Sequence, residues 1–447
     1  MCANASAIIR FFASYSLLLM PLGVPGLKRV FGAILLLSLC GGFVSCGNYN
    51  NNAYGGITAT PPSTSASNPN VPSKLGFRAF VSNPLSITAL GTNGPALNIV
   101  DASIDFLSIS TVDLSSLPDA GMMALAPSKA FTLVLNPTTN SIAVVDNTHE
   151  AVQSTVNLPG TTRSMFVWTD NQTGYAAIPT APVNTGQGPS PGAVVAMNLP
   201  NSVISATIPV AGAQYIVESH NGSKILAFGS NPQAVTIISP SQIGTSTDPR
   251  TAVSSPSFDH PVWGAFSADD TTAYILNCGP ECGGTVASVA VLDMTQSPPH
   301  VTATIAVPAA TYGLLSGSRL YVAGTSASGG ALSVIGLGSN TVLNPAPIAI
   351  SDGYHDRMAI STSGELFVGA RTCSGGCLSI FNPASSAVVV PSANGDVTGI
   401  QPITGRNVVY VCQNGALNIY STTTNALQTT QVDIVGQAVD VELVDSP

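Results

Sequence analysis

The chain has 447 residues, a net charge of −9 and only 8% charged residues, against roughly 25% in an ordinary soluble domain. It contains 42 glycines and 33 prolines, which favour turns and oppose long helices. The acidic balance opposes contact with a phosphate backbone, so we expect no nucleic-acid partner. This composition predicts an all-β fold of short strands, closed so that few strand edges stay free.

The first 45 residues have the layout of an export signal. Lys28 and Arg29 precede an apolar run over residues 30–44, which is too short for a transmembrane helix. We therefore predict a signal peptide over residues 1–45 and an exported mature protein. A second apolar run, over residues 7–20, exceeds what a signal peptide needs, so we expect translation to start near Met20.

The segment FVSC at residues 43–46 resembles the lipobox of bacterial lipoproteins, in which the cysteine is acylated and becomes the new N-terminus. The resemblance implies a membrane anchor at Cys46, and Gly47 in the next position implies sorting to the outer membrane of the cell envelope. The alternative is an ordinary secretory signal with an incidental cysteine. Residues 46–73 are rich in Asn, Gly, Ser, Thr and Pro, which predicts a flexible tether.

One phrase recurs through the remaining residues, 74–447. It is a short apolar strand that runs directly into a single turn-forming residue, at steps of 45, 52, 41, 54, 43, 46 and 39 residues. A period near 46 indicates a single β-propeller of four-stranded blades. The turn-forming residues that end the eight phrases are Asp101, Asp146, Asn198, Ser239, Asp293, Gly336, Asn382 and Ser421.

The first phrase lacks an inner strand before it, because the apolar residues 77–81 lead directly into it. We expect residues 438–444 to supply the missing strand, so that the two ends of the chain share a blade and close the ring. Eight blades are favoured, with seven as the alternative if one phrase is an insertion.

Two segments, NSIAVVDNTHEAVQSTVNLPG and ALNIYSTTTNALQTTQV, resemble the YVTN-type repeat, in which an apolar strand, an Asp/Asn turn and a Thr-rich outer strand recur. The segment FSADDTTAYILN resembles the turn between the first two strands of that repeat. Membership would imply an exported bacterial propeller, and some members are lactonase-like. Function transfers poorly between propellers.

Three of the phrases end in aspartate, which could indicate a metal or acid–base site. The equivalent positions in other blades hold Asn, Ser or Gly, and all of these residues suit tight turns. We therefore interpret Asp101, Asp146 and Asp293 as turn residues and expect no metal. Asp269 and Asp270 are interpreted in the same way.

Two cysteine pairs, Cys278 with Cys282 and Cys373 with Cys377, fall between the second and third strands of their blades. In an exported protein each pair is expected to form a small disulfide. A zinc site is the alternative, because C-x3-C lies within the spacing of zinc ligands, but the pairs are two blades apart. Cys412 has no evident partner and is expected to be a buried small hydrophobe.

In a propeller, the loops between second and third strands open on the same face as the starts of the inner strands. Polar and aromatic residues gather at these predicted starts, although the chain otherwise avoids charge. A site, if present, is expected near the axis on this face. The residues concerned are Arg163, Gln214, Asp259, His260, Tyr312, Tyr354, His355, Asp356, Arg357 and Gln401.

The leading functional hypothesis is a lipid-anchored binding or scaffold module for an envelope protein or glycan, acting as a monomer without a cofactor. The alternative is a lactonase-like hydrolase, in which His260 or His355 acts as the base and Arg357 or Arg163 stabilises an oxyanion. No diagnostic catalytic motif is present in the sequence. With only two tryptophans, a quinone-dependent dehydrogenase is not expected.

Overall fold

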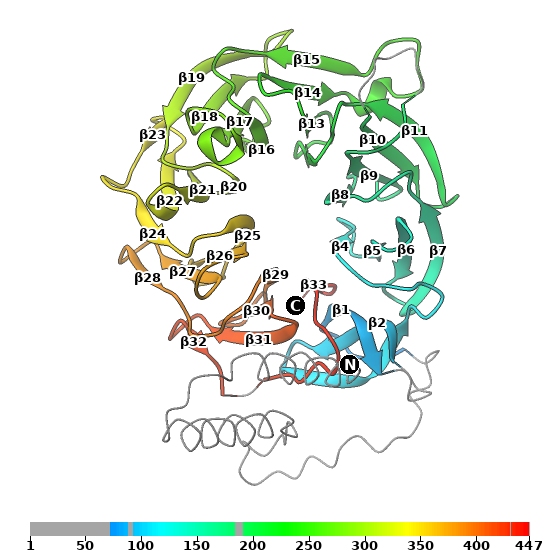
Figure 1. Ribbon diagram of the computed structural model, residues 1–447. Coiled ribbons are helices and arrows are strands. Elements are labelled where there is room, and N and C mark those ends of the chain that lie inside the picture. Colours follow the sequence, from blue (N-terminus) through cyan, green and yellow to red (C-terminus); the bar gives the residue numbers. More distant parts are fainter. Residues whose placement is uncertain (1–71, 88–92, 184–190, 430, 447) are drawn as a thin grey trace, which may run out of the picture. The chain divides into compact units, whose positions relative to one another are not determined.

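The computed structural model describes residues 72–446, except 88–92, 184–190 and 430, and these residues form one ring of eight β-sheets (Figure 1). The predicted signal peptide and most of the predicted tether, including Cys46, lie outside the described residues. The described part of the chain contains no helix long and apolar enough to cross a membrane. The all-β propeller prediction is confirmed, and the ring has eight blades rather than seven.

Each blade is an antiparallel sheet whose strands follow one another from the axis outward. The first four blades, with the inner strand named first, are β33 (Asp440–Leu443), β1 (Arg78–Ile87), β2 (Asn93–Asp101) and β3 (Phe106–Asp113); β4 (Met123–Leu125), β5 (Phe131–Asn136), β6 (Ser141–Asp146) and β7 (Ala151–Asn157); β8 (Ser164–Val167), β9 (Thr173–Ile178), β10 (Ala193–Asn198) and β11 (Val203–Pro209); and β12 (Tyr215–Glu218), β13 (Ile225–Phe228), β14 (Ala234–Ile238) and β15 (Arg250–Ser254).

The other four blades follow the same order. They are β16 (Pro261–Phe266), β17 (Thr272–Asn277), β18 (Ser288–Asp293) and β19 (His300–Ala306); β20 (Tyr312–Ser316), β21 (Arg319–Ser326), β22 (Gly329–Gly336) and β23 (Thr341–Val342), with β24 (Ile348–Ile350) also paired to β22; β25 (Tyr354–Ile360), β26 (Leu366–Arg371), β27 (Leu378–Asn382) and β28 (Ala387–Val389); and β29 (Val397–Pro402), β30 (Val408–Gln413), β31 (Ala416–Ser421) and β32 (Ala426–Leu427). Two short 3₁₀ helices, η1 (Pro240–Gln242) and η2 (Gly279–Cys282), lie in loops.

The recurring phrase is the third strand of every blade, and its apolar character follows from its position. Strands such as β6 and β18 are buried at five consecutive residues, because neighbouring blades cover both faces of the sheet. Outer strands such as β7 and β19 instead alternate between exposed and half-buried residues. One apolar cluster fills each of the eight junctions between adjacent blades.

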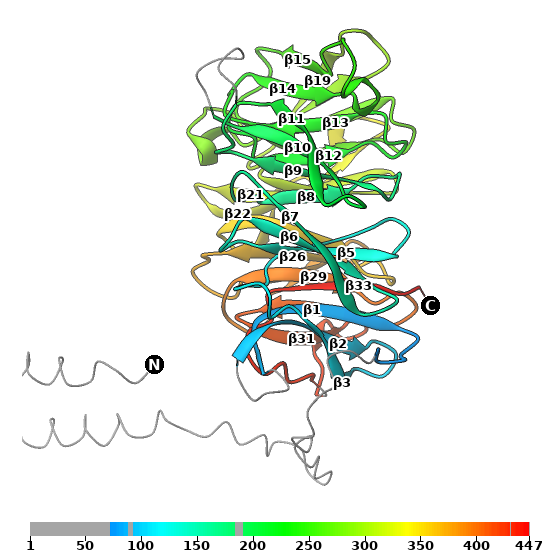
Figure 2. The same cartoon turned by 90° about the vertical axis from the view of Figure 1, so that its right-hand side faces the viewer.

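The two ends of the chain share the first blade, as predicted. Strand β33 pairs with β1 from Ala79 opposite Leu443 to Ser82 opposite Asp440, and Figure 2 shows these strands side by side. Only four residue pairs make this junction. Other interactions are therefore expected to reinforce it.

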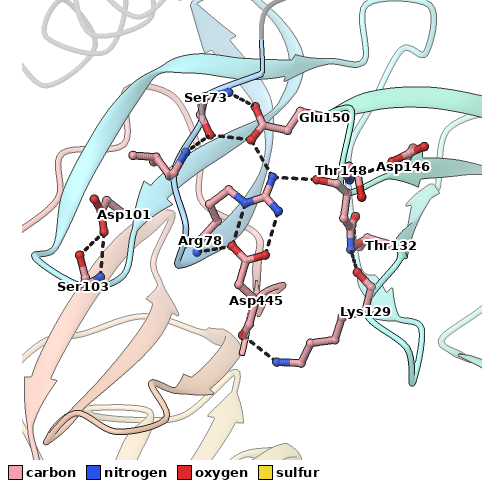
Figure 3. Close-up of polar contacts among 12 residues, drawn as sticks. Ser73, Arg78, Asp101, Ser103, Lys129, Thr132, Asp146, Thr148, Glu150 and Asp445 are labelled. Atoms are coloured by element: carbon pink, nitrogen blue, oxygen red, sulfur yellow. Dashed lines mark hydrogen bonds and ion pairs between the residues drawn. The ribbon is translucent and has the colours of Figure 1, made fainter. Parts of the chain in front are cut away.

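An ion network reinforces the closure on the side of the ring where β1 begins (Figure 3). Arg78 donates to Asp445 through Nε and Nη2, both at 2.8 Å, and through Nη1 to Glu150 at 2.7 Å. Glu150 also accepts from the Ser73 backbone at 2.6 Å, and Lys129 donates to the Asp445 carbonyl at 2.7 Å. We call this network the latch. It joins both ends of the chain to the second blade.

Candidate functional site

The ring has two distinct sides, which we name by what they carry. The mouth face is the side where the inner strands begin and the loops between second and third strands open. The latch face is the opposite side, which carries the latch and the turns after the third strands. Most of the polar residues singled out from the sequence begin, or directly precede, inner strands on the mouth face.

Arg357 lies near the axis of the ring on the mouth face. Its Nε donates to the Thr398 carbonyl at 2.9 Å and its Nη1 to the Asp356 carbonyl at 2.8 Å. A bulge in β25 lies between His355 and Arg357, and such an extra residue re-aims the side chains next to it. Burial opposes the charge of this guanidinium, but the carboxylates of Asp356 and Asp440 raise the pKa of Arg357 above its usual range.

Asp356 forms a second charged contact at the same place. Its Oδ2 lies 2.9 Å from Arg371 Nε and 3.7 Å from Arg357 Nη1. Its Oδ1 is buried and has no hydrogen-bond partner within the described part of the chain. Burial is the main cause of the raised pKa of Asp356, and the two arginines counteract it.

Aromatic side chains from four blades surround these charges. Tyr215 and Tyr312 meet edge to face at 6.2 Å between ring centroids, with their hydroxyls 3.4 Å apart, and Trp263 packs on Tyr312 at 5.3 Å. Tyr354 is 50% exposed. Its pKa is raised by burial and by Asp356 and lowered by Arg163, a residue of the third blade.

The sequence interpretation missed two acidic residues, Asp440 and Glu442, on the inner strand β33. Val441 and Leu443 between and beside them pack in the core, so the two carboxyl groups share the opposite face of the strand. Asp440 accepts from the Met123 backbone at 2.8 Å. Burial and the neighbouring Asp440 raise the pKa of Glu442 to about 8. The sequence did carry a signal for these two residues, because acidic and apolar residues alternate over 440–443 and so place both carboxyl groups on one face of the strand.

Asp259 and His260 form an ion pair just before β16, with His260 Nδ1 2.8 Å from Asp259 Oδ1. The backbone N–H groups of Thr285 and Val286 donate to Asp259 Oδ2 at 2.7 and 2.8 Å. Partial burial raises the pKa of Asp259, but the hydrogen bonds from His260 and from this loop outweigh burial and hold that pKa below its usual range. The pair is therefore fixed in position.

Both predicted disulfides are present, Cys278–Cys282 and Cys373–Cys377. Glu281, inside the first loop, accepts from Thr311 at 2.5 Å and from the Thr325 backbone at 2.9 Å in the next blade. The loop of the second disulfide likewise reaches the following blade.

In that second loop, the Thr372 backbone donates to Asp396 at 2.7 Å. Cys412 is buried and free, as expected. All four cysteines of the zinc alternative are held in disulfides, which contradicts that alternative.

Two residues expected at the mouth, His355 and Gln401, lie elsewhere. His355 is 1% exposed, its Nε2 is 3.0 Å from the Ser351 carbonyl, and burial lowers its pKa to about 4. It is a core residue of its blade and is not presented to the mouth with His260. Gln401 is the fifth residue of β29, not its first, and donates to the Pro402 carbonyl at 2.8 Å. Arg163 and Gln214 precede their inner strands as expected, and both are exposed.

The aspartates that end the third strands act as turn residues. Asp101 accepts from the Ser103 backbone at 2.9 Å, Asp146 from the Thr148 backbone at 2.8 Å and Asp293 from the Thr295 backbone at 2.9 Å. They lie on the latch face, away from the mouth. Asp269 and Asp270 also accept hydrogen bonds within and between turns.

Comparison with solved structures supports the assignment of this chain to the β-propellers. The dihydro-heme d1 dehydrogenase NirN, in complex with DHE, is 13% identical with a TM-score of 0.61 over 83% of this chain and 75% of that one. The Pseudomonas aeruginosa periplasmic gluconolactonase PpgL is 15% identical with a TM-score of 0.50, over 83% of this chain and 99% of that one. Kuenenia stuttgartiensis hydrazine synthase is 14% identical with a TM-score of 0.51, over 71% of this chain and 97% of that one.

At these identities the similarities define the fold alone. No protein-family model and no curated protein matches the chain. Membership of the YVTN-repeat family and the lipoprotein anchor therefore stay predictions from the sequence.

Proposed function

We propose that this protein is an extracytoplasmic binding module of the bacterial cell envelope, held at a membrane by a lipid on Cys46, that binds a protein or a glycan at its mouth. One observation carries the proposal. In a chain with only 8% charged residues, charged and aromatic residues begin or directly precede the inner strands of several blades on one face, and Arg357 interacts there with Asp440, Tyr312 and Tyr215 of three other blades. Convergent polar groups among aromatic side chains are typical of a binding site.

The loops around this mouth are constrained, which suits binding. The Cys278–Cys282 loop is fixed to the following blade through Glu281, and the Cys373–Cys377 loop through Asp396. Pre-organised loops lose less conformational entropy when a ligand binds. We propose that the chain acts as a monomer at the outer membrane and belongs with the YVTN-type propellers, as its repeats suggest.

The described chain leaves Ser73 next to Glu150, on the latch face. The tether from a lipid on Cys46 would therefore join the ring on the latch face, which would leave the mouth open to a partner. To test the anchor, Cys46→Ser is compared with the natural sequence by membrane fractionation. We expect the variant to move to the soluble fraction, and unchanged membrane association would contradict the anchor.

A lactonase-like hydrolase is the second candidate, and the Asp259–His260 pair favours it. A carboxylate on Nδ1 sets the tautomer of the imidazole and leaves Nε2 as a base, which is the arrangement of many general bases. A gluconolactonase is among the proteins with a similar fold. The side chain of His260 is 35% exposed, so a substrate could reach it.

The two functions are separated by turnover on a panel of lactones. His220 forms the same kind of pair with Asp270, at 2.9 Å, on the latch face, so His220→Ala is a matched control for His260→Ala. The binding proposal expects no turnover by the natural sequence. Turnover that His260→Ala abolishes and His220→Ala retains would overturn the noncatalytic proposal in favour of the hydrolase.

A further inference from the structure

Exposed apolar side chains gather on the outer strand of the first blade. This strand, β3, and the turn before it present Ile104, Phe106 and Ile109, which are 66%, 63% and 73% exposed. We call these three residues the rim patch. Within the described part of the chain, the outer strands β11, β28 and β32 carry one exposed large apolar residue each, and β7 and β19 carry none. Single exposed apolar residues are ordinary on a protein surface, whereas a group of them marks a place of contact.

The core of the ring does not need the rim patch. Leu107 and Val112 of the same strand pack into the apolar clusters on the two sides of the first blade. The register of β3 against β2 shifts between Asn98 and Val100, so residues 108–110 lie opposite one residue of β2 and leave the regular pairing. Ile109 is the middle residue of this bulge, and burial in the fold does not account for an isoleucine there.

The rim patch presents almost no charge. No residue from 106 to 112 is charged. Asp105 is the only acid between Ile104 and Ile109, and its side chain is 6% exposed and accepts from Arg406 Nη2 at 2.7 Å. Its charge is therefore balanced inside the protein. An apolar surface without free charges can enter the headgroup boundary of a bilayer without the cost of desolvating an ion.

The chain enters the ring at the blade that carries this patch. Ser73 donates to Glu150, and Leu75 packs at the junction of the first and second blades. About 26 residues separate Cys46 from Ser73, and a coil of that length would span roughly 25 to 30 Å. A lipid on Cys46 would therefore hold the first blade near the bilayer at a high effective concentration, at which a weak apolar contact is sufficient. Figure 2 shows β3 at one edge of the ring, opposite to β15.

We propose that the rim patch docks on the lipid bilayer, with Phe106 and Ile109 in the headgroup boundary. This inference rests on the proposed lipid anchor at Cys46 and adds the orientation of the ring, because the rim, and neither face, lies against the membrane. The mouth then opens along the membrane surface. A second copy of this chain and a protein partner on the patch are outcomes that the experiment separates from lipid.

The test uses the full lipidated chain in vesicles of phosphatidylethanolamine and phosphatidylglycerol that carry a lipid-bound fluorescence quencher. Cys412 is buried and the other four described cysteines form disulfides, so a cysteine added to the surface can be labelled alone. We expect the lipid to quench a fluorescent label at Ile109→Cys. The same label at Thr302→Cys, an exposed position of β19 on the opposite side of the ring, should not be quenched (Figure 1).

A serine substitution in the patch measures what the apolar contact contributes. With the label at position 109, Phe106→Ser should lower the ratio of docked to undocked chain about tenfold, because most of one phenylalanine side chain is lost from the contact. Val203→Ser is the matched control, since Val203 is 51% exposed and begins the outer strand β11 as Phe106 begins β3. It should leave the ratio unchanged. Vesicles without phosphatidylglycerol should give the same quenching, because the patch has no free charge.

Absence of quenching at position 109, equal quenching at positions 109 and 302, equal effects of the two serine substitutions, or a requirement for phosphatidylglycerol would overturn the inference. A label at position 109 that is shielded from water but not quenched would place a protein or a second copy on the patch and refute the lipid. In each of these cases, membrane association that Cys46→Ser abolishes would leave the anchor standing. A natural chain that does not associate with membranes would refute the anchor and the docking together.

Discussion

Arg78 is the residue whose loss should weaken the closure of the ring most. Its guanidinium forms two hydrogen bonds to Asp445, one to Glu150 and one to the Asn147 carbonyl. The side chains of Arg78 and Glu150 are 12% and 3% exposed. Arg78→Met keeps an unbranched apolar stem but leaves two carboxylates without their cation.

The expected loss can be estimated from these contacts. Removal of one partner from a buried ion pair costs about 3 to 5 kcal/mol. Glu150 keeps its two hydrogen bonds from Ser73, and Asp445 is 19% exposed, so we expect the lower end, about 3 kcal/mol. With an unfolding entropy of about 2.1 cal/mol/K per residue, this loss lowers the Tm by about 4 °C.

Urea unfolding followed by circular dichroism measures the loss, and Arg319→Met is the matched control. Arg319 is the first residue of the second strand in its blade, as Arg78 is in its own, but it is exposed and forms no ion pair within the described residues. We expect Arg319→Met to change the free energy of unfolding by less than about 0.5 kcal/mol. Equal effects of the two substitutions would refute the role given to the latch.

Three further outcomes are expected. The pKa of Glu442 is raised to about 8, so the folded state keeps a proton that the unfolded state loses, and stability falls as the pH rises from about 4.5 to 8. Glu442→Gln should remove this fall, which is on the order of 5 kcal/mol, in urea titrations at several pH values, and an unchanged pH profile would contradict the prediction. The pKa of His355 is lowered to about 4, so stability is lost as the pH falls from about 6.5 to 4. This loss is about 3 kcal/mol, and His355→Gln should reduce it. A steeper loss of stability in the variant would contradict the prediction. Replacement of Cys278 and Cys282 by serine should cost about 2 kcal/mol, because the disulfide closes a short loop, and a more stable variant would refute the stiffening role.

The architecture was predictable because its signals are local. A third strand buried on both faces must be continuously apolar, and the residue after it must form a turn, so the phrases ending at Asp146 and Asp293 already locate their blades. The shared first blade was predictable too, since the first recurring phrase follows a single strand and lacks an inner neighbour before it. The small disulfides followed from spacing and export alone.

The mouth was predicted only in outline. Its position follows from the direction of the strands, which placed Asp259, His260 and Tyr354 correctly. The orientation of side chains does not follow, because it depends on strand register and on the bulge in β25. The bulge separates His355, which is buried in its blade, from Arg357, which interacts with Asp440 and Tyr215 of other blades.

The sequence by itself determined a ring of eight similar blades, its closure by both ends of the chain and the turn role of the repeated aspartates, because each of these depends on neighbouring residues or on a regular period. Only the tertiary structure decided which side chains meet at the axis. Arg357, Glu442 and Tyr215 come from three blades that are distant in the chain, and no local pattern carries the information that strands so far apart share one axis. The joining of Arg78 to both Glu150 and Asp445 has the same origin, since only the closed ring brings those two acids together.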